Sequence, residues 1–185
     1  MVLSTQLVKR IKPIIFFSLL SPSLIWAYQF FIGNLGINPI DRLMDKLGEF
    51  ALQLLIATLF LSSLSKQKTF RSLQILRRMI GLFVFYYVCL HIMTYIVLDH
   101  FFNWKLIFKD ILKRPFITFG FISFLLLVPL ALTSTKAMVR KLTYKVWKNL
   151  HKLIYIVAPL ATMHFFLLTK ADKKEPMIYL MMILI

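Results

Sequence analysis

The chain has 185 residues, of which 59% are hydrophobic and 16% are charged, and its mean hydropathy is +0.77. Soluble domains are less apolar and carry about a quarter charged residues, so this composition excludes a soluble domain and indicates an integral membrane protein. A net charge of +16 would suggest nucleic-acid binding in a soluble protein. In a membrane protein it is typical of basic loops that set topology and meet anionic lipid, so we expect membrane lipid and no nucleic acid as partner.

Six apolar stretches predict membrane-spanning helices. They cover residues 13–32, 47–64, 79–98, 116–133, 150–169 and 176–185, with ends that are approximate. A helix needs roughly 20 residues to cross a bilayer. The sixth stretch has ten residues before the sequence ends, so we expect that helix to be incomplete here. The predicted fold is an all-α integral membrane protein, a single transmembrane domain 1–185 built as a six-helix bundle.

Three prolines lie inside these stretches, at Pro22, Pro129 and Pro159. A proline lacks the N–H that the helical ladder needs and crowds the preceding turn. Inside a membrane, neighbouring helices and local side chains can bind the carbonyl groups that a proline frees. We therefore predict kinks, and no breaks, at these three positions.

The loop charges predict which side of the membrane each connection occupies. The N-terminal segment, the second connection and the fourth connection hold thirteen lysines and arginines and no acidic residue. The seven acidic residues lie in or beside the other connections: Asp41, Asp45, Glu49, Asp99, Asp110, Asp172 and Glu175. Because basic loops stay in the cytoplasm, we predict a cytoplasmic N-terminus and a third and fifth span that both run outward.

Two histidines occur at matching depths in the third and fifth spans. His91 lies twelve residues past Met79, and His164 lies fourteen residues past Leu150. Both are roughly 18–21 Å from the cytoplasmic end at 1.5 Å per residue. Ionisable side chains are costly inside a membrane, and neutral imidazole is a common metal ligand. Two imidazoles at one depth suit the two axial ligands of a haem iron; the alternative is that each is a buried polar residue with a protein partner.

His151 lies at the cytoplasmic end of the fifth span, thirteen residues before His164. That spacing corresponds to roughly 20 Å along the axis and leaves the side chains roughly 140° apart on a straight helix, so we do not expect them to share a face. The same depth on the third span holds Arg77 and Arg78. From the residues alone, His151 could ligate an inner haem, line a quinone or flavin site, or lie in the headgroup region.

Arg77 and Arg78, with Lys148 and Lys152, form a basic cluster at the predicted cytoplasmic edge. Arginine binds a carboxylate or phosphate through two parallel hydrogen bonds, which suits haem propionates or a flavin phosphate. Contact with lipid headgroups is the alternative.

Three further residues lie near His91 in the sequence. Tyr87 and Tyr95, four residues before and after it, lie near its face and could fix the ring tautomer or only pack. His100 follows Asp99 at the predicted outer end of the third span. We expect His100 to be solvated and not to be a ligand.

The small numbers of glycines and cysteines exclude several kinds of redox site. Only five glycines are present, and no Gly-rich dinucleotide-binding loop occurs, so any reductant must come from another molecule. The single cysteine, Cys89, excludes internal disulfides, CxxC redox pairs and covalent CxxCH haem attachment. Any haem must therefore be held by coordination and packing.

Several strings in the sequence together resemble one family. They are RRMIGLFVFYYVCLHIMTY at 77–95, KRPFITFG at 113–120, LALTSTKAM at 130–138, WKNLHKLIYIVAPLATMHF at 147–165 and EPMIYL at 175–180. Their combination is similar to the MsrQ family, the haem-binding membrane subunit of the bacterial periplasmic methionine sulfoxide reductase system. That family belongs to the superfamily of ferric-reductase-like transmembrane domains.

The resemblance implies a non-catalytic electron-transfer subunit of the bacterial inner membrane, with six helices and b-type haem. It implies that electrons from the quinone pool or a cytosolic flavin reductase pass through haem b, one or two per chain, and FMN. The acceptor would be a periplasmic molybdopterin catalytic subunit of the MsrP type, which reduces methionine sulfoxide in oxidised proteins. The family's haem histidines match His91, His151 and His164. We expect the acceptor to dock on the outward loops, especially residues 99–114.

The sequence departs from the wider superfamily on the third helix, where paired histidines are reduced to His91. Two other functions fit the composition. One is a stand-alone transmembrane ferric or cupric reductase, against which the missing nucleotide-binding domain argues. The other is a non-redox membrane scaffold or transporter, in which the histidines would be structural or would relay protons.

Overall fold

The computed structural model describes residues 4–169 and 173–184, which are helical apart from their connections. The predicted all-α class is confirmed for these residues. Asp172, which enters the topology prediction, and Ile185, where the sixth stretch ends, lie outside the described residues. The chain divides into two compact units, Met1–Phe101 and Phe102–Ile185.

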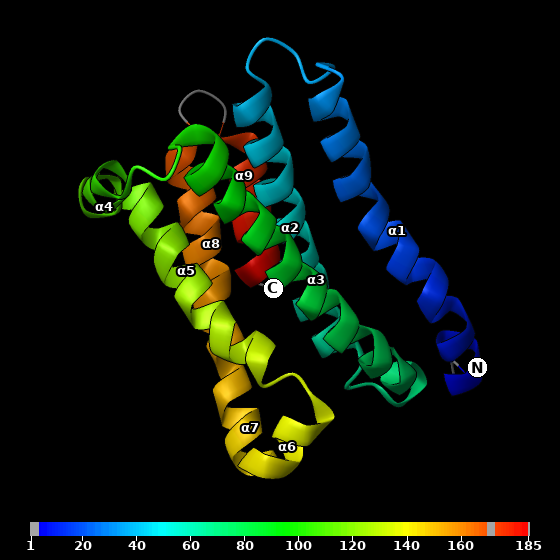
Figure 1. The fold of residues 1–185 in the computed structure, drawn as a ribbon. Helices are drawn as coiled ribbons and strands as arrows, with labels where there is room; N and C mark the ends of the chain where they lie inside the picture. The colour runs from blue at the N-terminus through cyan, green and yellow to red at the C-terminus, as the bar shows by residue number, and fades with distance from the viewer. Residues whose placement is uncertain (1–3, 170–172, 185) are drawn as a thin grey trace. The chain divides into compact units, whose positions relative to one another are not determined.

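The first unit is built from three long helices: α1 (Thr5–Phe31), α2 (Pro39–Leu64) and α3 (Gln74–Met93) (Figure 1). A 3₁₀ segment, η1 (Lys68–Leu73), precedes α3, and a π-helical segment, η2 (Thr94–Asp99), continues it. Both α2 and α3 begin before the apolar stretches predicted at 47–64 and 79–98. Helical hydrogen bonding continues through polar residues that a hydropathy pattern assigns to the membrane edge.

The helices α2 and α3 pack against each other in an antiparallel register. Gly81 on α3 lies opposite Thr58 on α2, and His91 on α3 lies opposite Gly48 on α2. A step of ten residues forward along α3 therefore moves the point of contact ten residues back along α2. The buried side chains of this pair form much of the unit's core: Leu47, Ala51, Leu55, Ile80, Phe83 and Val84.

The second unit contains six α-helices and a 3₁₀ turn in its described residues. These are α4 (Trp104–Lys113), α5 (Pro115–Leu132), α6 (Lys136–Leu142), α7 (Tyr144–Leu150), η3 (His151–Leu153), α8 (Ile154–Leu168) and α9 (Lys174–Leu184). Here α5 packs against η3 and α8. Gly120 meets His164, and Thr133 meets His151, so this pair is also antiparallel.

Local sequence signals explain several helix ends. Proline occupies the first helical position of α2 and α5, where its missing N–H costs nothing. The side chain of Asn103 accepts from Leu106 N–H at 3.2 Å and begins α4, and that of Thr135 accepts from Met138 N–H at 3.1 Å and begins α6. Between α1 and α2, Gly33 has a positive φ of 71°, a conformation that favours glycine.

The helix α1 runs through Pro22 with the help of a side chain from α3. The Tyr87 hydroxyl donates to the Leu19 carbonyl at 2.6 Å and accepts from Ser23 N–H at 3.3 Å. A regular helix would join those two backbone groups directly. The Ser21 hydroxyl donates at 3.1 Å to the carbonyl that Pro22 frees, four residues before the proline. The predicted absence of a break is therefore confirmed here, and α5 and α8 likewise continue through Pro129 and Pro159.

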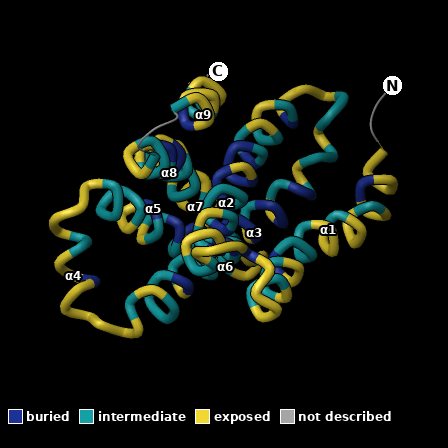
Figure 2. The backbone as a smooth tube through the Cα atoms, turned by 90° about the horizontal axis from the view of Figure 1, so that it is seen from above, coloured by how far each residue is buried: buried dark blue, intermediate teal, exposed yellow. Residues whose placement is uncertain are grey.

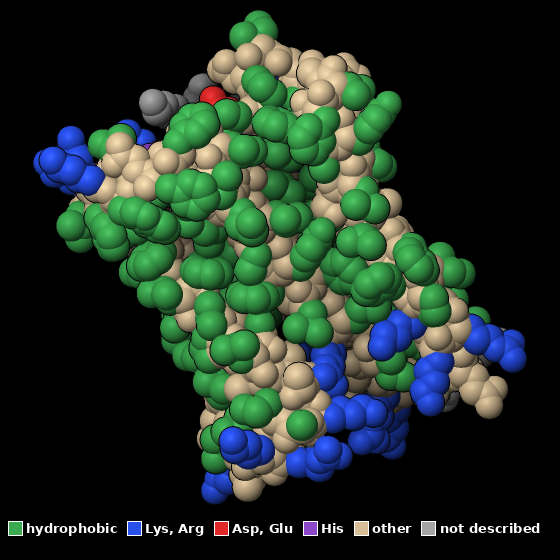
Figure 3. Space-filling view, in the orientation of Figure 1, with side chains coloured by type: hydrophobic (Ala, Val, Ile, Leu, Met, Phe, Trp, Pro, Cys, Tyr) green, Lys and Arg blue, Asp and Glu red, His purple; other side chains and the backbone are tan. Residues whose placement is uncertain are grey.

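In the described part of the chain, five helical segments are long and apolar enough to cross a membrane. They are α1, α2, Lys68–Asp99, α5 and Tyr144–Leu168. Hydrophobic side chains cover the sides of the helices, and Lys and Arg side chains gather near helix ends (Figure 3). The helix α1 buries only Val8 and Ser23, whereas buried positions run along α2 and α3 (Figure 2). The sixth span and the cytoplasmic N-terminus stay predictions.

Candidate functional site

His91 is held by the backbone of the neighbouring helix. Its ring lies on α3, half-buried, with Nδ1 2.9 Å from the carbonyl oxygen of Met44 on α2. A carbonyl can only accept, so the proton of the neutral ring is on Nδ1 and the lone pair is on Nε2. The antiparallel register of α2 and α3 brings these two residues together, although 47 positions separate them in the sequence.

His164 repeats this arrangement in the second unit. Its Nδ1 lies 2.6 Å from the carbonyl oxygen of Phe116 on α5, 48 positions earlier. The two rings of these residues are tilted, with centroids 6.2 Å apart. The same argument places the proton on Nδ1 and the lone pair on Nε2. His91 and His164 thus have the same tautomer, each set by a main-chain carbonyl on an earlier helix of its own unit.

These two imidazoles have the chemistry of metal ligands. A histidine that binds a metal almost always donates its other ring N–H to a carbonyl, carboxylate or water, which orients the ring and raises its basicity. A porphyrin supplies four nitrogens to iron, and the protein has to supply only axial ligands. Each of these two histidines therefore has the ring tautomer that an axial haem ligand would need, with its lone pair on Nε2.

His151 has a different partner and the opposite tautomer. Its Nε2 lies 3.1 Å from the Thr133 hydroxyl, which in turn lies 2.6 Å from the carbonyl oxygen of Pro129. A hydroxyl donates one proton, and the shorter contact to the carbonyl takes it, so Thr133 accepts from Nε2–H. The lone pair of His151 is then on Nδ1.

The cluster around His151 also contains an indole. The ring of Trp147 packs on that of His151 with centroids 4.2 Å apart, and its Nε1 donates to the Thr133 carbonyl at 3.0 Å. Both contacts connect the α7–η3 segment with the end of α5. His151 is therefore held by protein groups at the end of α5 and in α7.

The prediction for His100 is wrong in one respect. Its side chain is only 12% exposed, with Nδ1 2.9 Å from the carboxylate of Asp99 and the ring 4.3 Å from that of Tyr95. The π-helical segment η2 carries the helix as far as Asp99 and lets His100 fold back on Tyr95. It is mostly buried and not solvated.

Tyr87 does not fix the tautomer of His91. Its hydroxyl binds the backbone of α1, as described above, and its ring packs edge-on against Phe50 and Trp26. The Met44 carbonyl fixes the tautomer instead. Spacing along a helix face could not tell toward which neighbouring helix the Tyr87 hydroxyl points.

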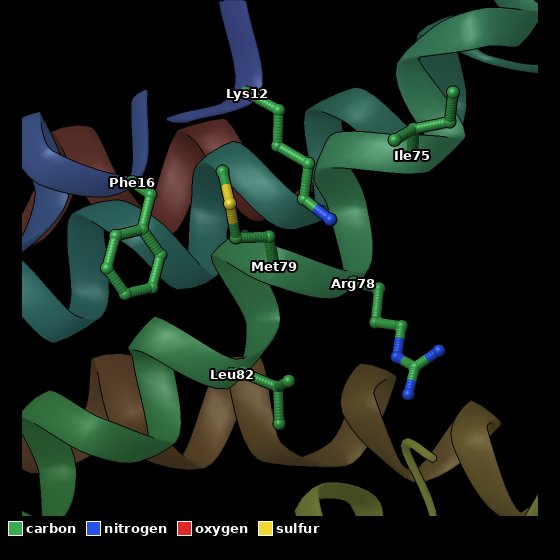
Figure 4. A pocket seen from close by; sticks show the side chains of 6 residues that line it. All are labelled: Lys12, Phe16, Ile75, Arg78, Met79 and Leu82. Carbon is green, nitrogen blue, oxygen red and sulfur yellow. The ribbon is translucent and has the colours of Figure 1, made fainter. Parts of the chain in front are cut away.

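Of the two predicted arginines, Arg77 is half-buried and Arg78 is exposed. Arg78 lines a cavity of about 320 Å³ between α1 and α3, together with Lys12, Phe16, Ile75, Met79 and Leu82. Figure 4 shows Lys12 reaching from α1 toward the first turns of α3. Sequence reasoning missed Lys12 as a neighbour of Arg78, because their proximity depends on how α1 packs on α3. Lys148 and Lys152 belong to the second unit.

The comparisons with known proteins agree on one family. The family model described as a ferric reductase like transmembrane component matches residues 47–162. This range contains His91, His151, Arg77 and Arg78, and it ends two residues before His164. No solved structure matches the chain.

Curated relatives named protein-methionine-sulfoxide reductase heme-binding subunit MsrQ match most of the chain. The relative from Caulobacter vibrioides is 45% identical over 153 residues, 83% of this chain and 73% of that protein. The one from Rhodospirillum rubrum is 46% identical over 89% of this chain and 79% of its own length. The one from Herminiimonas arsenicoxydans is 41% identical, with 91% and 78% covered.

Proposed function

The chain belongs to the MsrQ family, and from that membership we propose that it is the haem-binding membrane subunit of a protein-methionine-sulfoxide reductase. Together with its apolar helices, this makes it a multi-pass bacterial membrane protein. The observation that carries the haem proposal is the repeated hydrogen bond from imidazole Nδ1 to a helix carbonyl, at His91 and at His164.

We propose His91 and His164 as the axial ligands of a haem b, each through Nε2. Their matching depths in two outward-running spans support a shared haem, and their common tautomer supports ligation through the same ring atom. Haem, when bound, accepts and releases single electrons. The protein's contribution is to hold two neutral imidazoles in place within an apolar surrounding, which tunes the potential of the iron.

His151 enters the proposal as a ligand of a second, inner haem. It is one of the three histidines that match the family pattern, and its ring is held by Thr133 and Trp147. Because Thr133 accepts from Nε2–H, the atom that would bind iron is Nδ1. We propose no protein mate for it.

The cavity beside Arg78 is proposed as the place for an anionic group, with FMN phosphate as the specific assignment. Two cations, Lys12 and Arg78, line it, and its other walls are apolar. This combination suits a ligand with a charged end and a flat apolar body. Arg77, half-buried one residue earlier, is proposed as a partner of a haem propionate.

The proposed electron path crosses the bilayer of the inner membrane. Electrons would enter on the cytoplasmic side from the quinone pool or a flavin reductase, near Arg78 and His151. They would leave on the periplasmic side, near His91 and His164, to a molybdopterin catalytic subunit of the MsrP type. The predicted loop charges support this direction, because they place the basic ends of the helices inside.

The test of this function is the reduced-minus-oxidised spectrum of the purified protein. We expect a b-type haem signal in the wild-type protein and, in His91→Ala and in His164→Ala, loss of the part of this signal that comes from the haem they share. A matched control is His100→Ala, which removes an imidazole of the unit that contains His91, one that is bound to Asp99. A full b-type signal in both ligand variants would contradict the proposal. Absence of haem from the wild-type protein would favour a non-redox function.

A further inference from the structure

Each unit contains a glycine that lies against the imidazole of the proposed ligand. A Cβ atom at Gly48 on α2 would lie 3.0 Å from Nδ1 and 3.1 Å from Cε1 of His91. At Gly120 on α5 the corresponding distances to His164 would be 2.9 and 3.1 Å. Nonbonded carbon contacts are normally 3.5–4.0 Å. Any side chain at these two positions would therefore crowd the ring.

Each of these glycines follows, by four residues, the residue whose carbonyl binds the imidazole. Gly48 follows Met44, and Gly120 follows Phe116. In an α-helix the carbonyl of residue i accepts from the N–H of residue i+4, and the two residues share one face. A carbonyl oxygen has a second lone pair. A residue without a side chain at i+4 leaves that lone pair accessible to a ring from the neighbouring helix.

We propose that Gly48 and Gly120 are positioning residues for the two axial ligands, an inference that rests on the haem ligation proposed above. The glycine lets the imidazole lie against the neighbouring helix, and the carbonyl one turn earlier takes the Nδ1 proton. The ring is thereby fixed in orientation and in the tautomer that presents the Nε2 lone pair. No sequence repeat between the two units reveals this shared arrangement.

The distances rank the expected effects of adding one methyl group. Alanine at position 120 meets His164 below 3.0 Å, so the ring must move. Alanine at position 48 meets His91 at 3.0 Å and requires a smaller shift. The matched control is Gly81, also inside a helix of the first unit, where a Cβ would make an ordinary contact of 3.9 Å with the Thr58 side chain.

The first experiment uses the purified full chain with haem and records optical and EPR spectra. We expect Gly120→Ala to lose most of the six-coordinate low-spin signal, Gly48→Ala to lose less of it, and Gly81→Ala to keep it. Added free imidazole, which can bind iron without the helix, is expected to restore the low-spin signal. Wild-type optical and EPR spectra in both Gly120→Ala and Gly48→Ala would overturn the proposal.

A second experiment needs no haem and covers variants that fold poorly. In the cofactor-free chain, ¹⁵N NMR of histidine is expected to report the Nδ1–H tautomer at His164 and its loss in Gly120→Ala. In a double-mutant cycle, the drop in melting temperature caused by Gly120→Ala is expected to vanish in a His164→Ala background. An equal drop in both backgrounds would overturn the proposal. Absence of haem from the wild-type protein would overturn only the proposed function, and the cycle would still decide the role of the glycine.

Discussion

Arg78 has the same relationship to His91 that His151 has to His164: each precedes the histidine by thirteen residues. The antiparallel registers of the two helix pairs give this equal spacing a structural meaning. In the first unit His91 lies opposite Gly48, and in the second unit His164 lies opposite Gly120. The two helix pairs therefore correspond at the ends predicted to face outward. At the predicted cytoplasmic end, the first pair carries a guanidinium and the second an imidazole.

This asymmetry leads to a prediction for His151. Because no histidine occupies the corresponding position in the first unit, an inner haem depends on His151 as its histidine ligand. We expect His151→Ala to lower the haem content by one per chain and to leave the haem of His91 and His164 in place. A pyridine haemochrome assay on the purified protein measures this number. An unchanged haem content would remove His151 from the ligand set and leave it a residue that holds η3 to α5.

Thr133 gives a second, independent prediction. Thr133→Val keeps the side-chain shape but removes the acceptor of the His151 Nε2 proton. Loss of such a supporting hydrogen bond typically weakens metal affinity about 10–100-fold, and we expect that loss for the inner haem, measured by haem titration. The matched control is Thr162→Val, whose hydroxyl is buried in α8 and donates to the Ala158 carbonyl at 2.9 Å. Equal affinities in both variants would contradict the role given to Thr133.

The depth of the two ligands could be predicted from the sequence, whereas their partners could not. The rise per residue of an α-helix is constant, so counting from the membrane edge places His91 and His164 at one level. The carbonyls of Met44 and Phe116 depend on the register between two helices, which no periodicity within one helix encodes. Gly48 and Gly120 are two of five glycines in an apolar chain, and nothing in the sequence alone distinguishes them from the other three.

The Tyr87 hydroxyl is predicted to stabilise the packing of α1 in the first unit. Tyr87→Phe removes the hydroxyl that links the Leu19 carbonyl with the Ser23 N–H. Leaving such buried groups without a partner costs about 1–3 kcal/mol, and we expect this loss in the free energy of unfolding measured in detergent. Tyr86→Phe is the control, because the Tyr86 hydroxyl lies 3.1 Å from the Ser23 hydroxyl and does not link the two backbone groups of α1. A loss in Tyr86→Phe as large as in Tyr87→Phe would contradict this explanation.

The cavity beside α1 gives a prediction about flavin. A hydrogen bond to a charged group contributes about 1.5–3 kcal/mol, or about 10–100-fold in Kd. We expect Arg78→Gln and Lys12→Gln each to weaken FMN binding by that factor, measured by quenching of flavin fluorescence. Arg71→Gln is the control, because Arg71 is exposed in η1 and does not line the cavity. The same FMN affinity in the wild-type protein and all three variants would exclude this cavity as the flavin site.

The helix α4 has two stripes of different chemistry, each with a spacing of four residues. Trp104, Phe108 and Leu112 form one stripe and are 54%, 63% and 84% exposed, so other parts of this chain leave them largely uncovered. The second stripe is basic and consists of Lys105, Lys109 and Lys113. An apolar stripe beside a basic one is typical of a helix that lies in the membrane interface, with tryptophan at headgroup level.

We therefore predict that the apolar stripe of α4 lies in lipid and leaves its lysines for the aqueous side. Of the three tryptophans, Trp26 and Trp147 are replaced by phenylalanine, so that all tryptophan fluorescence comes from Trp104. In vesicles with brominated lipids, bromine near the headgroup should quench its fluorescence more strongly than bromine near the chain ends. Leu112→Lys, which places a charge in the apolar stripe, should reduce the quenching. If no brominated lipid quenched Trp104, the stripe would instead be covered by protein, as docking of a partner on residues 99–114 would require.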